Sequence, residues 1–258
     1  MPRWVAVLLG VFLGATTATA LTDPFAELKG PIAAMEEWSY SVEEKFGEPV
    51  KILEGHRKEI YDSHSNPIET IEYTVSGTIK KRYVRTYDNG GRLLQVIVYD
   101  ALGNLEGKTI CEYEGNILFA KEYGPTGKLT GAYRQELDSA GRIIRMVLYD
   151  ETGKQTGVTE SSYAPDGKLL LTRIVTDTGE IVTAYSYNVE GMDVVTETTI
   201  YVAGIKFTTL ITGTRVVATD PYGNWTEKHV FTRKERFGRV EWVLDRIYER
   251  IFTYRDSG

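Results

Sequence analysis

Residues 87–103, YDNGGRLLQVIVYDALG, hold two Tyr-Asp-x-x-Gly turns with an eight-residue run between them. An aspartate early in such a turn can accept hydrogen bonds from nearby backbone N–H groups, and glycine tolerates the positive φ of the closing position. The run between the turns is rich in Leu, Ile and Val, which are common in strands. The stretch therefore predicts one β-strand held between two tight turns.

The same unit recurs along most of the chain. Successive turn glycines are separated by 12, 12, 12, 14, 12, 14, 12 and 12 residues, as a short turn plus a strand of about eight residues requires. Because internal periodicity outweighs local propensity, the chain is predicted to be an all-β, antiparallel up-and-down meander of repeated hairpins. We expect its twisted sheet to be open or partly closed. The series consists of Gly91, Gly103, Gly115, Gly127, Gly141, Gly153, Gly167, Gly179 and Gly191.

Six of these glycines, Gly91, Gly103, Gly127, Gly141, Gly153 and Gly167, are predicted to be structural turn residues. Every second turn carries another glycine four residues on, at Gly107, Gly131 and Gly157. In a meander every second turn lies at the same end of the sheet. The extra glycines therefore predict bulges along one rim.

The N-terminal residues 1–20 have the three parts of a secretory signal peptide. Arg3 is followed by an apolar run at residues 4–13 and by the small-x-small sequence Ala18-Thr19-Ala20. We expect cleavage after Ala20 and export to the periplasm or the extracellular space, with no transmembrane segment in the mature chain. Residues 21–258 are predicted to form a single β-repeat domain, with regular repeats at about 61–204 and a C-terminal β segment at 205–258.

Two segments fit either a helix or a strand. Residues 33–46 contain good helix formers but precede a strand-rich region, and residues 240–254 combine helical spacing with β-branched and aromatic residues. We favour strands for residues 240–254 and leave both alternatives open for residues 33–46.

The turn motifs carry a family resemblance. Residues 99–104 (YDALGN) and 149–154 (YDETGK) resemble the YD repeats of bacterial Rhs-type proteins, and residues 127–131 (GKLTG) are similar to variant MORN repeats. The resemblance covers roughly residues 61–204. It implies a bacterial, extracytoplasmic β-sheet protein that offers a face for binding.

No catalytic, metal or cofactor motif emerges from the sequence. His56, His64 and His229 have no metal-ligand spacing, and Cys111, the single cysteine, is predicted to be a buried strand residue. The acidic group Glu43, Glu44 and Glu48 is interpreted as a solvated face. A net charge of −6, with Lys and Arg spread through the repeats, argues against a nucleic-acid partner.

The tyrosines are the best indication of a ligand. Tyr99, Tyr123, Tyr149 and Tyr163 are candidates for an aromatic ladder that binds a glycan or a peptide, although cross-strand aromatic pairs also stabilise sheets without any ligand. The sequence thus predicts a non-enzymatic binding or structural module of the bacterial envelope, with a protein or glycan partner of unknown identity. The alternatives are a secreted glycan hydrolase and a periplasmic lipid carrier.

Overall fold

The computed structural model describes residues 28–255 apart from residue 237. The predicted signal peptide at residues 1–20 lies outside the described residues. Within them, no helix has the length and apolar character that crossing a membrane would require.

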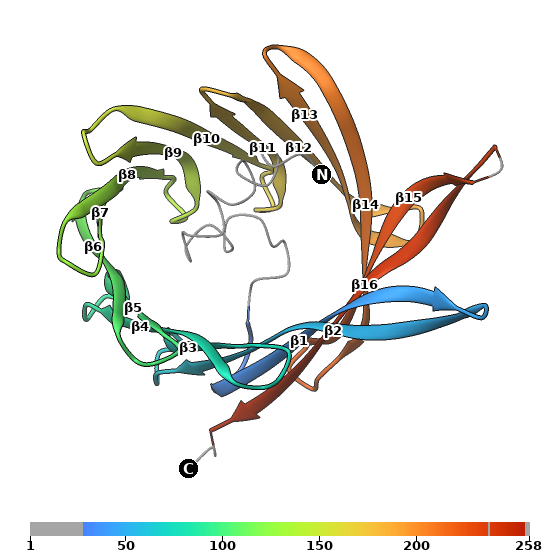
Figure 1. Ribbon diagram of the computed structural model, residues 1–258, viewed down its shortest axis with the longest axis horizontal. Helices are drawn as coiled ribbons and strands as arrows, with labels where there is room; N and C mark the ends of the chain where they lie inside the picture. The colour runs from blue at the N-terminus through green and yellow to red at the C-terminus, as the bar shows by residue number, and fades with distance from the viewer. Residues whose placement is uncertain (1–27, 237, 256–258) are drawn as a thin grey trace.

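The described residues form sixteen strands, each antiparallel to its neighbours (Figure 1). Of the two segments that fitted either helix or strand, residues 33–45 lie in the first strand and residues 240–254 in the last, while Phe46 lies in the turn after the first strand. The strands are β1 (Ile32–Lys45), β2 (Glu48–Tyr61), β3 (Pro67–Tyr73), β4 (Ile79–Tyr87), β5 (Leu93–Asp100), β6 (Leu105–Glu114), β7 (Ile117–Tyr123), β8 (Leu129–Leu137), β9 (Ile143–Asp150), β10 (Gln155–Tyr163), β11 (Leu169–Thr176), β12 (Gly179–Val189), β13 (Met192–Val202), β14 (Ile205–Thr219), β15 (Trp225–Arg236) and β16 (Arg239–Tyr254).

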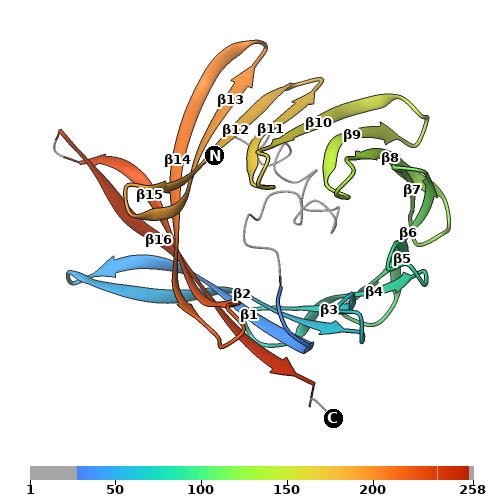
Figure 2. The same cartoon turned by 180° about the vertical axis from the view of Figure 1, so that it is seen from behind.

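The sheet closes into a barrel, so the expectation of an open or partly closed sheet is wrong. β1 pairs with β16 over a long register that runs from Ile32 opposite Tyr254 to Ser41 opposite Arg246. Figure 1 and Figure 2 show the resulting ring of strands from its two ends. Closure satisfies the backbone groups that two edge strands would leave unpaired. Both closing strands lie outside the regular repeats, and therefore the repeat motifs could not predict that these two strands pair.

The turns have the predicted chemistry. At residues 100–104, the Asp100 side chain accepts hydrogen bonds from the backbone N–H groups of Leu102 and Asn104, both at 2.9 Å. Bonds from the side chain and the backbone N–H of Asn104 lower the pKa of Asp100. Gly103 closes the turn at φ 82°, and all six glycines named as turn residues have φ values between 77° and 90°.

The second glycines mark bulges. Register shifts immediately precede Gly107, Gly131 and Gly157, always at the rim that holds the β5–β6, β7–β8 and β9–β10 turns. A Cβ atom on Gly107 would lie 2.9 Å from the carbonyl oxygen of Tyr123 on the next strand. Gly179 departs from the series because it begins β12 instead of closing a turn.

The two faces of the barrel differ in burial. Side chains alternate between the faces along each strand, and on β9 Met146 is 2% exposed whereas the side chain of its neighbour Arg145 is 40% exposed. Met146 belongs to a cluster on the inner face of β6–β9, which we call the apolar wall. Its buried members are Cys111, Leu118, Ala120, Tyr133 and Met146.

The outer face carries ion pairs within its strands. Arg145 lies 3.3 Å from Glu136 and 4.0 Å from Glu160, and Arg173 lies 3.7 Å from Glu160 and 2.7 Å from Glu180. We call this chain of charges across β8–β12 the outer charge belt. Such a charged surface is suited to contact with water and not with an apolar medium, because charges are costly to remove from water.

Candidate binding site on the inner face of the barrel

A row of three charged side chains crosses the closing strands on the inner face. Glu37 on β1 lies directly opposite Arg57 on β2 and Arg250 on β16. Arg57 Nε lies 3.0 Å from Glu37 Oε1, and Arg250 Nε donates to Glu37 Oε2 at 2.7 Å. We call these three residues the inner charged row. Only 5% of the Arg250 side chain and 12% of the Glu37 side chain is exposed.

Aromatic rings and a third cation extend the row along the inner face. The guanidinium carbon of Arg250 lies 3.7 Å from the centre of the Trp225 ring. Lys228 Nζ lies 4.3 Å from the same ring and 5.1 Å from the Tyr248 ring. Trp225 is 5% exposed, so these contacts form where little water competes with them.

Burial also changes the acid–base properties of Tyr61, at the end of β2. Its hydroxyl donates a hydrogen bond of 2.5 Å to Glu59, which itself lies 3.7 Å from Arg57. Desolvation, and then the negative charge of Glu59, raises the pKa of Tyr61 well above its usual range. This tyrosine therefore remains a neutral hydrogen-bond donor.

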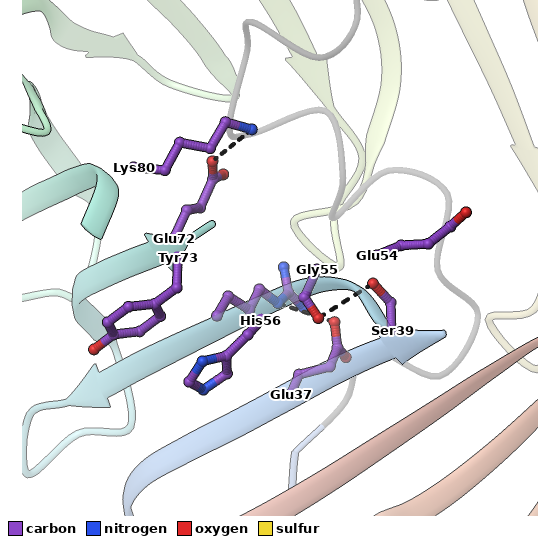
Figure 3. Close-up of a pocket in the computed structure, with 9 residues that line it drawn as sticks. Glu37, Ser39, Glu54, Gly55, His56, Glu72, Tyr73 and Lys80 are labelled. Atoms are coloured by element: carbon purple, nitrogen blue, oxygen red, sulfur yellow. Dashed lines mark hydrogen bonds and ion pairs between the residues drawn. The ribbon is translucent and has the colours of Figure 1, made fainter. Parts of the chain in front are cut away.

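A polar recess of about 240 Å³ adjoins the inner charged row. Its lining includes Glu37 and Arg57, together with Glu72 and Lys80, whose charged ends are 3.9 Å apart. Figure 3 shows Glu72 and Lys80 on the inner side of the sheet, with the ring of His56 directed to the other side.

Three buried donors in or near the row make no hydrogen bond within the part of the chain that the structure describes. They are Nε of Arg57, Nη1 of Arg250 and Nε1 of Trp225. An unsatisfied donor in a buried position carries a free-energy cost that an acceptor from a bound molecule would relieve. The site is thus suited to a ligand that brings oxygen acceptors.

The apolar wall lies across the barrel from the inner charged row. In the strand order, β8 and β9 are the strands farthest from β1. The inner face therefore has one charged and one apolar side. Glu122, at the edge of the apolar wall, is desolvated by burial, which raises the pKa of its carboxyl group.

The structure separates the four tyrosines proposed as an aromatic ladder. Tyr99, Tyr123 and Tyr149 lie at the ends of β5, β7 and β9, at one rim and on the outer face. Tyr163 lies at the opposite rim on the inner face, and its hydroxyl donates to the carbonyl oxygen of Ile143 at 3.0 Å. A ligand that follows the outer face could meet the first three but not Tyr163.

Tyr163 belongs to a different and structural series. Tyr87 and Tyr187 occupy equivalent places, and their hydroxyls donate to the carbonyl oxygens of Pro67 and Leu169. Each bond ties the end of one strand to the beginning of the preceding strand, which is its antiparallel neighbour. Burial raises the pKa of Tyr87 to about 12, which keeps this donor neutral.

The remaining sequence candidates have ordinary surroundings. Glu43, Glu44 and Glu48 are all exposed around the β1–β2 turn, as the interpretation of a solvated face requires. Cys111 is a buried free cysteine, which confirms its prediction, and burial raises the pKa of its thiol to about 11. Glu37, which lines the recess, has both carboxylate oxygens in contact with guanidinium groups.

Sequence reasoning did not find the inner charged row. The available signal was the run Arg57-Lys58-Glu59, which places charges on both faces of one strand. One of those faces had to be the inner one. The third member of the row could not be identified from this run, because Arg250 reaches Glu37 only through closure of the barrel.

The fold and the inner face together define a closed, antiparallel, up-and-down β-barrel with a charged site on its inner wall. No protein-family model matches the chain, and no curated protein matches its sequence. Among solved structures it is similar to a porin-like protein from Bacteroides uniformis, with a TM-score of 0.55 and 12% identity, over 88% of this chain and 99% of that chain. At this identity the likeness shows a shared fold.

Larger toxin structures are matched more weakly. The Tc holotoxin pore of Photorhabdus luminescens gives a TM-score of 0.19 and 12% identity, over 76% of this chain and 13% of that chain. A TcdB2-TccC3-Cdc42 structure gives a TM-score of 0.19 and 13% identity, over 86% of this chain and 15% of that chain. The chain spans a small part of these proteins, and scores of this size support no further argument.

Proposed function

We propose that the protein is an exported, non-enzymatic β-barrel of the bacterial envelope that binds an amphiphilic molecule with an acidic head group against its inner face. The proposal narrows the binding role expected from the sequence and combines it with the lipid-carrier alternative. The distribution of polarity over the two faces of the barrel is the observation that carries it.

Around the apolar wall and the outer charge belt, this distribution is the reverse of the one that a membrane-spanning barrel requires. Such barrels present an apolar band to the lipid, and an arginine or lysine at the bilayer midplane costs roughly 2–4 kcal/mol. Here the outer charge belt places Arg145 and Arg173 within strands on the outer face, while the apolar wall faces inward. The apolar surface suited to a ligand is therefore inside the barrel.

The chemistry of the ligand follows from the inner face. The apolar wall favours an acyl chain or another apolar group. The free donors on Arg250 and Trp225, with the cation of Arg57 beside the recess, favour a carboxylate or a phosphate. An amphiphile with an acidic head satisfies both requirements in one molecule.

The test is a titration with an anionic fluorescent amphiphile, such as a fatty acid that carries a polyene chromophore. We expect saturable binding that Arg57→Met weakens about tenfold, because a hydrogen bond to a charged group contributes roughly 1.5–3 kcal/mol. Arg145→Met in the outer charge belt is the matched control and should bind as the parent does. Circular dichroism checks that both variants keep their strands.

Two results would contradict the proposal. The first is the absence of saturable binding for fatty acids and lysophospholipids alike. The second is an equal loss of affinity in Arg57→Met and Arg145→Met, which would place the probe on the outer face or in a non-specific aggregate.

A further inference from the structure

The two rims of the barrel differ in the side chains that their turns present. Turns that follow odd-numbered strands, from β1–β2 to β15–β16, all lie at one rim, because successive turns of a meander alternate between its ends. Five neighbouring hairpins of this rim each expose a large apolar residue at the tip. These residues, which we call the apolar tips, are Ile205, Val240, Phe46, Val75 and Leu102 in the order of the hairpins around the barrel.

The exposure of the apolar tips is nearly complete in several cases. Leu102 is 86% exposed and Ile205 is 73% exposed, and Phe46 is fully exposed at the end of the β1–β2 hairpin. This hairpin and the β15–β16 hairpin project beyond the ring in Figure 1. Apolar side chains held away from the core at the ends of hairpins contribute nothing to the packing of the barrel.

The turns of the opposite rim are polar by comparison. Residues 62–66 read DSHSN, residues 88–92 read DNGGR and residues 138–142 read DSAGR. Large side chains are exposed at this rim too, but Tyr222 packs against the Tyr254 ring at 4.4 Å between ring centres, and the strand-end residues are only 38–49% exposed, less than any apolar tip. These strand-end residues are Leu94, Ile144, Leu170, Val189 and Val217. The difference between the rims therefore does not result from turn formation, which both rims achieve with the same turn chemistry.

Tyrosines form a band at the same rim, and three of them, Tyr73, Tyr99 and Tyr201, end strands whose hairpins carry an apolar tip. Its members occupy strand ends at the same rim and face outward, where the Arg82 and Lys108 side chains lie over two of the rings. Tyrosine, which has an apolar ring and a polar hydroxyl, is enriched at the depth of lipid head groups. The band consists of Tyr73, Tyr99, Tyr123, Tyr149 and Tyr201.

We propose that this rim docks on the surface of a lipid bilayer, with the apolar tips in the acyl boundary and the tyrosine band among the head groups. The tips are single side chains on separate hairpins, and a fluid phase can surround each of them. A protein partner would instead need a continuous complementary surface of about 800 Å². The inference does not depend on the ligand of the inner face.

The charges near the apolar tips indicate which head-group charge the lipids need for docking. Lys45, Lys206 and Arg239 each adjoin an apolar tip in sequence, and their stems can extend toward the interface. Glu44 and Glu48 flank Phe46 and are exposed, so the rim is not a cationic patch. Docking should therefore occur on zwitterionic lipid and change little with salt.

The experiment is co-sedimentation of the purified protein with phosphatidylcholine vesicles. We expect Phe46→Ser and Leu102→Ser each to lower the partition coefficient about tenfold, as the loss of one large buried apolar side chain predicts. Leu170→Ser is the matched control, because Leu170 is 44% exposed on β11 near the opposite rim. It should leave partitioning unchanged. In the variant Phe46→Trp, the fluorescence emission of the new tryptophan should shift to shorter wavelength when vesicles are added.

Failure of the protein to sediment with vesicles would overturn the inference, and so would an equal loss of partitioning in Leu170→Ser. A concentration-dependent dimer that Phe46→Ser abolishes, without vesicle binding, would assign the rim to self-association instead. These outcomes are independent of the amphiphile titration, because the soluble probe is measured without vesicles.

Discussion

Removing one charge from the inner charged row should destabilise the barrel severely. Glu37→Gln keeps the shape of the side chain but leaves the guanidinium groups of Arg57 and Arg250 without their shared anion. Breaking a buried ion pair by neutralising one partner costs about 3–5 kcal/mol, because the remaining charge stays desolvated. The loss in the free energy of unfolding should lie near 3 kcal/mol, at the lower end of this range, since glutamine can still accept one hydrogen bond and Arg57 is partly exposed.

The assay is urea unfolding followed by tryptophan fluorescence, with the midpoint compared at an unchanged slope. Glu160→Gln is a matched control, because Glu160 also lies between two arginines on neighbouring strands but is 50% exposed on the outer face. Its cost should stay below about 1 kcal/mol. If the two variants lose the same free energy of unfolding, the inner row is no more desolvated than the outer charge belt and the reasoning is wrong.

Three further predictions concern single sites. Since burial raises the pKa of Glu122, its contribution to stability is present below its ordinary pKa of 4.5 and is lost as the pH rises through the raised value. Glu122→Gln should therefore unfold at a higher temperature than the parent at pH 7 and at a similar temperature at pH 3.5. The Cys111 thiol, with its pKa raised to about 11, should resist iodoacetamide at pH 8 until urea unfolds the chain, as mass spectrometry would record. Gly107→Ala should lose about 1–3 kcal/mol in urea unfolding, because the added Cβ would press on the carbonyl oxygen of Tyr123; unchanged stability would show that the bulge adapts freely.

The turns and strands could be predicted from the sequence because their chemistry is local. Asp100 and the N–H groups that it accepts from lie within five residues of one another, so a short motif contains the whole turn. The face on which a side chain lies was harder to read. Tyr99 and Tyr163 belong to repeats of similar sequence, but they end strands that run in opposite directions, and one faces outward while the other faces inward.

The bulges explain that difference and could have been used to anticipate it. A bulge before Gly107 or Gly157 adds a residue to one strand and resets the alternation of its side chains relative to the neighbouring strand. The second glycines marked the bulges at one rim, whereas the bulges at the opposite rim, between β4 and β5, β8 and β9, and β10 and β11, carry no such glycine. Counting faces strand by strand from those marks would have separated Tyr163 from Tyr99, Tyr123 and Tyr149.

The sequence by itself determined the strands and turns of the repeats and their order, because each depends on residues a few positions apart and on a period that repeats. The tertiary structure alone decided that the sheet closes and which charges meet. Glu37 and Arg250 are 213 residues apart, and only the pairing of β1 with β16 brings them to 2.7 Å. No local pattern encodes that contact, because closure depends on the twist and stagger accumulated over all the strands of the barrel.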